Sequence, residues 1–269
     1  MNDQIKKFKK DGYIDPIKIL NEEDCKNLSY EQFIPKKNYT WSKSIHEKSL
    51  EVINLAKNQK IIEIIKNLLG NNNIILWSSC FIKQNPGVQH SWHIDLEYRN
   101  WKGITLWLGL KNLSLNTKLS LIKCSQQLDT FPQKLYNEGI NINNDNEIIK
   151  SAKILNKDCE LETFNLNAGE IIVWEGKMWH KTINNSKKPR EAIILQYSTT
   201  DQKIKIPSNY NSIDLKWQNK KPPCVMVSGI DKYKKNLIID PSKIEANRKF
   251  IRQIYKIKFY LSKILRKFI

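Results

Sequence analysis

A series of short segments in the chain have the character of β-strands, and their number and spacing restrict the fold more than any other feature. Each segment is rich in β-branched or aromatic residues, and most are bounded by Gly, Asn, Pro or Lys. They cover residues 73–83, 88–95, 103–110, 118–124, 159–166, 170–176, 178–183 and 190–198. Backbone breakers lie between several of them, at residues 85–87, 167–169 and 184–186. So many short strands predict a β-sandwich or a β-barrel.

Two histidines and one aspartate occur within these segments in a pattern suited to a metal ion. His93 and Asp95 are two positions apart, so on a strand both side chains point to the same face while Ile94 turns into the packing behind them. His180 follows 87 residues later, in another predicted strand. Two imidazoles and one carboxylate are the ligand set that holds non-haem Fe(II) on one face and leaves other coordination positions open.

A His-x-Asp pair alone is a weak signal, because such pairs occur by chance and usually make surface hydrogen bonds. The chain has only four histidines, and three of them, His90, His93 and His180, fall within the two motifs. This scarcity favours a metal site. His90 lies three positions before His93, so it is predicted to point to the opposite face of the strand, in a structural or rim role.

The same residues carry a resemblance to a known family. His93-Ile-Asp95, the segment 104–110, residues 168–174 leading to His180, and Arg190 before an apolar strand together resemble the phytanoyl-CoA dioxygenase family of Fe(II)- and 2-oxoglutarate-dependent oxygenases. Residues 8–13, Phe-Lys-Lys-Asp-Gly-Tyr, followed by residues 20–28, look like the family's opening turn and first helix. The resemblance extends from about residue 8 to residue 198.

The resemblance implies a mainly β fold with flanking helices, whose core is a double-stranded β-helix of the jelly-roll, cupin-like type. It also implies that His93, Asp95 and His180 hold Fe(II) and carry catalysis, that Arg190 binds the cosubstrate 2-oxoglutarate, and that O2 is the oxidant. Arginine suits this role because its planar fork pairs with a carboxylate through two hydrogen bonds. The competing interpretation of Arg190 is a solvated charge at the edge of a strand.

Further side chains are candidates for the same site. Trp107 is expected against the cosubstrate, although a large aromatic residue on this strand can equally belong to the core. Many members of the family place a serine two residues after the arginine; here that position is Ala192, so one hydrogen bond to 2-oxoglutarate is either absent or supplied by Thr182. Four aromatic residues are candidates to line the pocket, two of which can equally be core: Trp92, Tyr98, Trp101 and Trp179.

The resemblance predicts a dioxygenase that hydroxylates an unactivated C–H bond and releases succinate and CO2. Asp95 separates the chain from halogenating relatives, which lack the carboxylate. Residues 116–119 and 123–126 depart from the family pattern at the pocket mouth, so a family substrate does not carry over. We expect a small or lipid-linked metabolite as substrate. The alternative is a catalytically silent binding protein on the same fold, recruited to a membrane or partner by its C-terminal helix.

Residues 241–269 form a second strong pattern. Apolar residues at positions 250, 254, 257, 261, 264 and 268 are spaced four and three apart, which is typical of one face of a helix. The segment carries nine cations and one acidic residue, a net charge of +8 out of +18 for the chain. A basic amphipathic helix suits the surface of an anionic membrane. The alternative is a helix that packs its apolar stripe on the β-core or on a partner subunit.

These patterns predict three parts of the chain. Residues 1–200 are expected to form the double-stranded β-helix oxygenase domain with N-terminal helices, residues 201–240 an irregular segment that wraps it, and residues 241–269 the amphipathic helix. Residues 129–157 are predicted as a long polar connection that borders the substrate entrance.

Composition restricts the location and the partners of the protein. Its five cysteines are scattered and odd in number, which indicates a reducing compartment. The sequence has no apolar leader and no run of apolar residues long enough to span a membrane. We therefore expect a cytoplasmic protein that attaches, if at all, to the inner face of the membrane. Nucleic acid is not an expected partner, because no recognised binding motif is present, and the sequence does not determine the oligomeric state.

Overall fold

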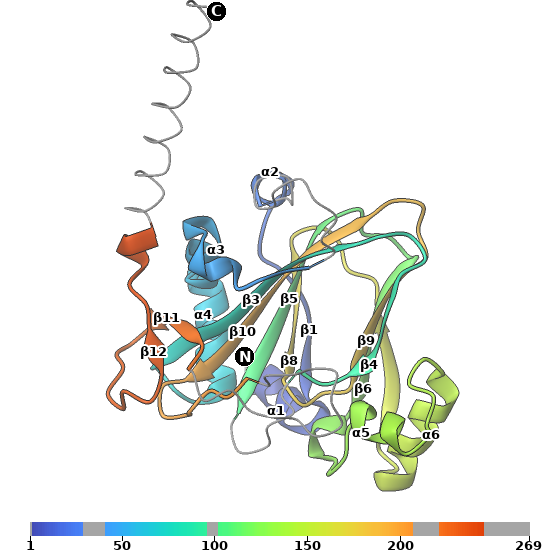
Figure 1. Cartoon of the computed structure of the whole chain (residues 1–269). Coiled ribbons are helices and arrows are strands. Elements are labelled where there is room, and N and C mark those ends of the chain that lie inside the picture. Colours follow the sequence, from blue (N-terminus) through green and yellow to red (C-terminus); the bar gives the residue numbers. More distant parts are fainter. Residues whose placement is uncertain (1, 29–40, 96–101, 207–220, 245–269) are drawn as a thin grey trace, which may run out of the picture.

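Two β-sheets face each other and hold most of the secondary structure, with helices on their outer sides (Figure 1). The computed structural model describes residues 2–28, 41–95, 102–206 and 221–244. The large sheet has the order β1-β8-β5-β10-β3-β11-β12, and β2 also pairs with β3. The small sheet has the order β4-β9-β6-β7. All strand pairs are antiparallel except β11 with β12.

The strands of the large sheet are β1 (Tyr13–Lys18), β2 (Trp41–Lys43), β3 (Ile74–Gln84), β5 (Gly103–Lys111), β8 (Glu170–Glu175), β10 (Arg190–Thr199), β11 (Pro223–Ser228) and β12 (Leu237–Ile238). Those of the small sheet are β4 (Gln89–His93), β6 (Thr117–Lys123), β7 (Glu160–Phe164) and β9 (His180–Asn184). From β3 to β10 the chain passes repeatedly between the two sheets, as in a jelly roll. This arrangement confirms the predicted double-stranded β-helix core.

The helices are α1 (Asn2–Asp11), α2 (Glu22–Asn27), α3 (Leu50–Ala56), α4 (Gln59–Leu69), α5 (Pro132–Asn137) and α6 (Asp145–Leu155), with 3-10 turns η2 (Ile45–Glu47) and η3 (Ser125–Gln127). Helix α4 begins where the Asn58 side chain accepts hydrogen bonds from Lys60 N and Ile61 N, and it ends at Gly70, which adopts a left-handed backbone. Among the described residues, no helix is both long and apolar enough to cross a membrane.

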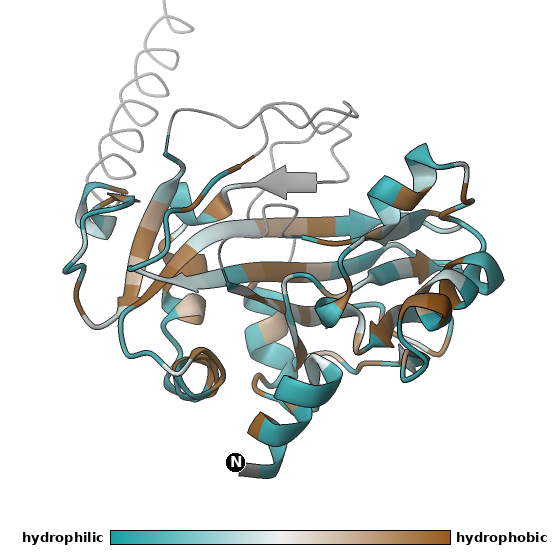
Figure 2. Ribbon diagram, turned by 90° about the horizontal axis from the view of Figure 1, so that it is seen from below, coloured by the Kyte–Doolittle hydropathy of each residue, from teal (hydrophilic) through white to brown (hydrophobic). Residues whose placement is uncertain are grey.

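The period-two alternation of the strands divides the apolar side chains between separate cores. On β5, Leu106 packs with α3 and α4 in the cluster outside the large sheet, whereas its neighbour Trp107 packs between the sheets. A third cluster lies between the small sheet and helices α5 and α6 and includes Trp92 and Trp179. Figure 2 shows hydrophobic colouring along the strands and on helix faces turned toward them. Side chains at alternate strand positions therefore line the volume between the sheets.

Gly12 makes the tight turn between α1 and β1 possible. Its φ angle is +90°, and a Cβ atom built on it would lie 2.1 Å from the sulfur of Met178. Only glycine fits such a position, because it lacks both the side chain and the steric penalty of positive φ. The Asp-Gly-Tyr turn thereby brings the N-terminal helix against the turn that precedes β9.

The strand predictions are confirmed within two residues at each end for all eight segments. One other prediction is wrong. Residues 201–240 are not irregular throughout, because β11 pairs with β3 and extends the large sheet. The long polar connection predicted over residues 129–157 contains two helices, α5 and α6. In both cases, apolar residues scattered along a polar segment pack against an element that is distant in sequence. β11 pairs with β3, and α5 and α6 pack behind the small sheet. The predicted C-terminal helix, from residue 245 onward, lies outside the described residues.

Candidate metal centre

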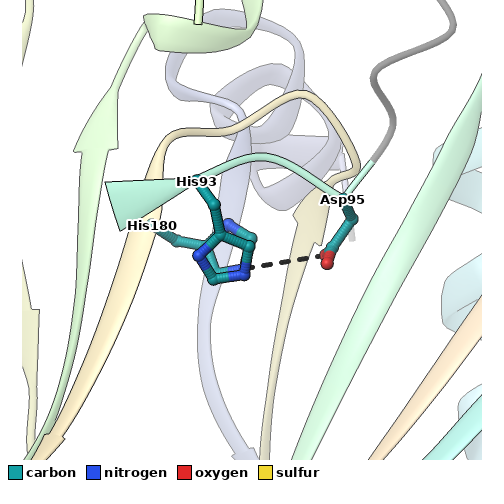
Figure 3. Close-up of side chains that lie close together, drawn as sticks. All are labelled: His93, Asp95 and His180. Carbon is teal, nitrogen blue, oxygen red and sulfur yellow. Dashed lines mark ion pairs between the residues drawn. The ribbon is translucent and has the colours of Figure 1, made fainter. Parts of the chain in front are cut away.

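Three side chains from two strands of the small sheet converge between the sheets (Figure 3). His93 ends β4 and Asp95 follows it, while His180 begins β9 directly opposite His93 in the ladder. One ligand atom from each of the three lies within 4.8 Å of the other two. His93 and Asp95 are partly buried and His180 is buried. This is the convergence that the spacing of the three residues predicts.

Both histidines are held with the same ring nitrogen facing away from the cluster. His93 Nδ1 lies 2.7 Å from the carbonyl oxygen of Ser91, and His180 Nδ1 lies 2.9 Å from that of Met178. A carbonyl oxygen only accepts hydrogen bonds, so in each ring Nδ1 donates and Nε2 keeps its lone pair. Nε2 is then the atom free to coordinate a metal, and the backbone bond fixes the orientation of the ring.

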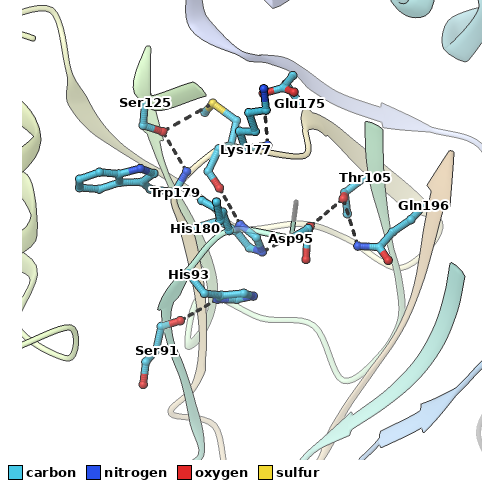
Figure 4. Close-up of polar contacts among 12 residues, drawn as sticks. Ser91, His93, Asp95, Thr105, Ser125, Glu175, Lys177, Trp179, His180 and Gln196 are labelled. Atoms are coloured by element: carbon cyan, nitrogen blue, oxygen red, sulfur yellow. Dashed lines mark hydrogen bonds and ion pairs between the residues drawn. The ribbon is translucent and has the colours of Figure 1, made fainter. Parts of the chain in front are cut away.

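Asp95 is oriented by the opposite sheet (Figure 4). Its Oδ2 atom accepts a 2.6 Å hydrogen bond from the hydroxyl of Thr105 on β5, and that hydroxyl in turn lies 3.5 Å from Nε2 of Gln196 on β10. Oδ2 also lies 3.7 Å from His180 Nε2. The backbone N–H of Asp95 donates to the carbonyl of Gly176 over 3.0 Å. The carboxylate is thus fixed through both its backbone and its side chain.

The environment of His93 favours its neutral form. Loss of water around His93, followed by the neighbouring His180 and His90, holds the pKa of His93 well below its usual value. A neutral imidazole is the form that binds a metal, since protonation and coordination compete for the same lone pair. The donor set therefore fits a divalent iron ion: two imidazoles and one carboxylate, the combination that non-haem Fe(II) sites use.

The prediction for His90 is wrong. Its ring centroid lies 3.9 Å from that of His93, so it is beside the metal ligand and not on the opposite side of the strand. The ladder between β4 and β9 has a register irregularity between His90 and His93, which resets the alternation of side chains. A bulge of this kind cannot be read from the spacing of the two residues alone.

Arg190 is buried between the sheets, and no described residue offers its guanidinium a hydrogen-bond acceptor. It has no exposed surface, and among the described residues its three guanidinium nitrogens find no hydrogen-bond acceptor. Burial lowers its pKa to about 10, so it remains charged at neutral pH. An unpaired buried charge is costly, and a planar guanidinium is the group that pairs with a carboxylate. The residue therefore fits a ligand that brings its own carboxylate, as 2-oxoglutarate does.

A strand pairing and a side-chain hydrogen bond connect the position of Arg190 to β9, the strand that carries His180. Gln84 is opposite Arg190 on β3, and its amide Nε2 lies 3.4 Å from the backbone oxygen of Thr182. Thr182 is two residues beyond His180 on β9, so both side chains project from the same face. The guanidinium carbon lies 5.1 Å from the ring of Trp107. Trp107 is therefore at once part of the inner core and in contact with Arg190.

Two of the four aromatic residues considered for the pocket belong to the core, the alternative that the sequence left open for two of them. Trp92 and Trp179 are fully buried in the cluster behind the small sheet, where their indole nitrogens donate to Asp145 and to the carbonyl of Thr130. Each immediately precedes a ligand histidine, and adjacent residues on a strand face opposite ways. Tyr98 and Trp101 lie outside the described residues.

Sequence reasoning missed Thr105, Gln196 and Gln84. All three are buried polar residues that project between the sheets from strands that are otherwise largely apolar. That contrast is the signal that could have identified them: a polar side chain on the inward face of a buried strand needs a polar partner.

Solved structures share the fold at low sequence identity. CytC3 with Fe(II) and alpha-ketoglutarate is 18% identical with a TM-score of 0.61, and the match covers 89% of this chain and 92% of that chain. The non-heme monooxygenase ThoJ in its Ni complex is 14% identical with a TM-score of 0.60, over 97% and 99% of the two chains. The epimerase SnoN in complex with Fe3+, alpha ketoglutarate and nogalamycin RO is 14% identical with a TM-score of 0.57, over 74% and 83%.

The sequence itself identifies the family. A search of curated protein sequences gives no match to the chain. The sequence profile described as Phytanoyl-CoA dioxygenase (PhyH), however, matches residues 9–192, which is more than half of the chain. The matched range contains His93, Asp95, His180 and Arg190. The chain therefore belongs to the phytanoyl-CoA dioxygenase family and is an oxygenase that uses iron and 2-oxoglutarate.

Proposed function

We propose that the chain hydroxylates an unactivated C–H bond of a small or lipid-linked metabolite, with consumption of O2 and 2-oxoglutarate and release of succinate and CO2. The observation that carries the proposal is the buried guanidinium of Arg190, which has no acceptor among the described residues and projects from the large sheet into the space between the sheets, where the His-Asp-His cluster of the small sheet also lies. The match of residues 9–192 to the phytanoyl-CoA dioxygenase family supports catalysis rather than binding alone. The catalytically silent alternative is therefore not favoured.

Each residue has a distinct role in the proposal. His93 and His180 would hold the metal through Nε2, and Asp95 through a carboxylate oxygen, while Arg190 would pair with the distal carboxylate of 2-oxoglutarate. Trp107 would contact the cosubstrate beside Arg190. Thr182 is the candidate hydrogen-bond donor to 2-oxoglutarate in place of the serine that many family members have at the position of Ala192. It projects from the same face of β9 as His180.

The bound iron and cosubstrate supply the oxidising chemistry, and the chain supplies position and a dry environment. Per turnover, one oxygen atom of O2 goes to the hydroxylated product and the other to succinate, as 2-oxoglutarate loses CO2. The buried ring of Trp174 lies beside His180, with the two ring centroids 4.9 Å apart, and would help to exclude bulk water from this side of the cluster. Exclusion of water protects a reactive site from side reactions.

Succinate release tests the activity. The purified protein with Fe(II), 2-oxoglutarate and O2 should form succinate slowly even without its substrate, and Asp95→Ala should abolish it. Asp158→Ala is the matched control, because Asp158 is an exposed acidic residue. If the wild type forms no iron-dependent succinate with any of a panel of small metabolites, the silent module is the better description.

A lipid-linked substrate would suit a protein attached to a membrane. This part of the proposal is supported by the sequence of residues 241–269 alone, since residues 245–269 lie outside the described residues. Co-sedimentation with vesicles containing anionic lipid should require the segment after Asp240. Equal binding by the full chain and by a chain that ends at Asp240 would contradict membrane attachment through this segment.

A further inference from the structure

The residues next to the two ligand histidines meet at one carboxylate on the outer face of the small sheet. Trp92 precedes His93 and Lys181 follows His180, and both side chains bond the same atom, Oδ1 of Asp145. The indole Nε1 of Trp92 donates over 2.8 Å, and the ammonium of Lys181 forms an ion pair with the same oxygen. Asp145 is the first residue of helix α6. One carboxylate thus joins the two strands at the positions beside the metal ligands.

The chain leading to Asp145 runs along strand β4. The backbone N–H of Trp92 donates to the carbonyl of Ile142 over 3.3 Å. The side-chain oxygen of Asn143 accepts from Ser91 over 2.6 Å and from Gln89 over 3.0 Å. Strand β4 is at the edge of the small sheet, with β9 on its other side. The segment therefore covers an open strand edge, at the strand that carries His93.

Burial makes the contact with Asp145 strong. Trp92 has no exposed surface and Lys181 is 7% exposed, whereas the side chain of Asp145 is 41% exposed. The ammonium of Lys181 also lies 5.6 Å from the centre of the Trp92 ring. Removal of the carboxylate would leave a largely buried charge and a buried indole N–H without their acceptor, which is more costly than the loss of an exposed pair.

We propose that Asp145 is a positioning residue for the metal centre: through Trp92 and Lys181 it fixes the relative placement of strands β4 and β9, and thereby the distance between His93 and His180. The bulge between His90 and His93 explains the need for it, because an irregular ladder holds the register less firmly than a regular one. The inference rests on the proposed metal-binding role of the two histidines. The segment that carries Asp145 thus supports the metal centre from the outer face of the small sheet.

Cobalt binding to the metal-free protein tests this role without turnover. Asp145→Ala should weaken Co(II) affinity on the order of 10-fold, the lower end of the cost for residues that support metal ligands indirectly. It should also change the visible absorption spectrum of the saturated Co(II) protein, because that spectrum reports ligand geometry. Asp145→Asn keeps an acceptor oxygen and should show a smaller loss.

A second variant separates positioning from stability. Ile148→Val shortens a fully buried side chain of the same helix without removing an Asp145 hydrogen bond, and should lower the melting temperature. It should bind Co(II) as tightly as the wild type and give the same spectrum. The proposal is overturned if Asp145→Ala binds Co(II) with wild-type affinity and spectrum, or if Ile148→Val weakens binding equally. If His93→Ala also binds like the wild type, the metal site itself is wrong, which is a separate outcome.

Discussion

Thr105 donates a 2.6 Å hydrogen bond to Oδ2 of Asp95, so a residue of the large sheet orients the only acidic member of a cluster that the small sheet carries. Thr105 is 1% exposed and its hydroxyl has a second neighbour, the amide of Gln196. The contact links the two faces of the jelly roll at the metal centre. It holds the carboxylate at the cluster through Oδ2, the oxygen that lies 3.7 Å from His180 Nε2.

Thr105→Val should weaken metal binding. Valine keeps the shape of threonine but cannot donate to Asp95, and loss of an outer partner of a metal ligand costs about 10–100-fold in affinity. Thr105→Ser keeps the hydroxyl and should retain most of the affinity. The measurement is Co(II) titration of the metal-free protein. Thr199→Val, the same change at a buried position of β10, is the control for folding effects. Equal affinity of the Thr105→Val and wild-type proteins would contradict the orienting role.

Arg190→Met should separate stability from cosubstrate binding. Without ligand, the variant should melt at a higher temperature than the wild type, because a buried charge that has no acceptor in the described part of the chain is replaced by an apolar side chain. Added 2-oxoglutarate should stabilise the wild type in proportion to the logarithm of its concentration over Kd, and the variant much less. Thermal melts with and without 2-oxoglutarate measure both effects. Arg190→Lys keeps a charge but not the fork, so its KM for 2-oxoglutarate should rise on the order of 10-fold or more.

An unchanged thermal shift with 2-oxoglutarate in Arg190→Met would remove Arg190 from the cosubstrate site. Succinate as ligand is a useful comparison, since it has two carboxylates but no keto group. A shift with succinate that depends on Arg190 would indicate that carboxylate pairing alone carries the effect.

The metal cluster could be predicted from sequence because it depends on local rules. His93 and Asp95 share a face through the alternation of a strand, and the strand boundaries were visible in the β-branched and aromatic residues. The same alternation places Trp92 and Trp179 on the opposite face from the adjacent histidines. The sequence left open that two of the four aromatic candidates are core, and applying the alternation to them identifies Trp92 and Trp179 as those two.

Other features depend on contacts distant in sequence and could not be predicted. His90 approaches His93 only because of a bulge in the ladder with β9. Asp145 meets Trp92 and Lys181 across 53 and 36 residues of chain. Strand β11 exists as a strand because β3 offers it an edge. In each case tertiary contacts determine the arrangement, and the local preferences of the sequence do not reveal those contacts.

The stability of the protein should fall in acid partly because of His46. This residue is 1% exposed, and its ring nitrogens lie 2.7 Å from the hydroxyl of Ser79 and 3.1 Å from the carbonyl of Pro223. Burial lowers its pKa below the usual value. The unfolded chain then binds the proton more readily, so stability is lost as the pH falls below about 6.5, the ordinary histidine value. The melting temperature should decrease from pH 7 to pH 5, and less steeply in His46→Gln. A parallel decrease in both proteins would exclude His46 as a source.

Glu175 should act in the opposite direction. It lies at the end of β8, and burial raises its pKa to about 7 while its Oε2 accepts a hydrogen bond from the backbone of Lys177 over 3.2 Å. The folded protein binds this proton more tightly than the unfolded chain does, so the associated stability is fully present in acid and is lost as the pH rises from about 4.5 to about 7.

Glu175→Gln removes that titration while its side-chain oxygen can still accept from Lys177. The variant should therefore be more stable than the wild type at pH 8, on the order of 1 to 3 kcal/mol, and the difference should shrink toward pH 5. Urea unfolding at the two pH values measures it. Glu138→Gln, at an exposed position, is the control and should show no such change. A stability difference that is the same at both pH values would mean that the substitution acts through packing and not through the proton.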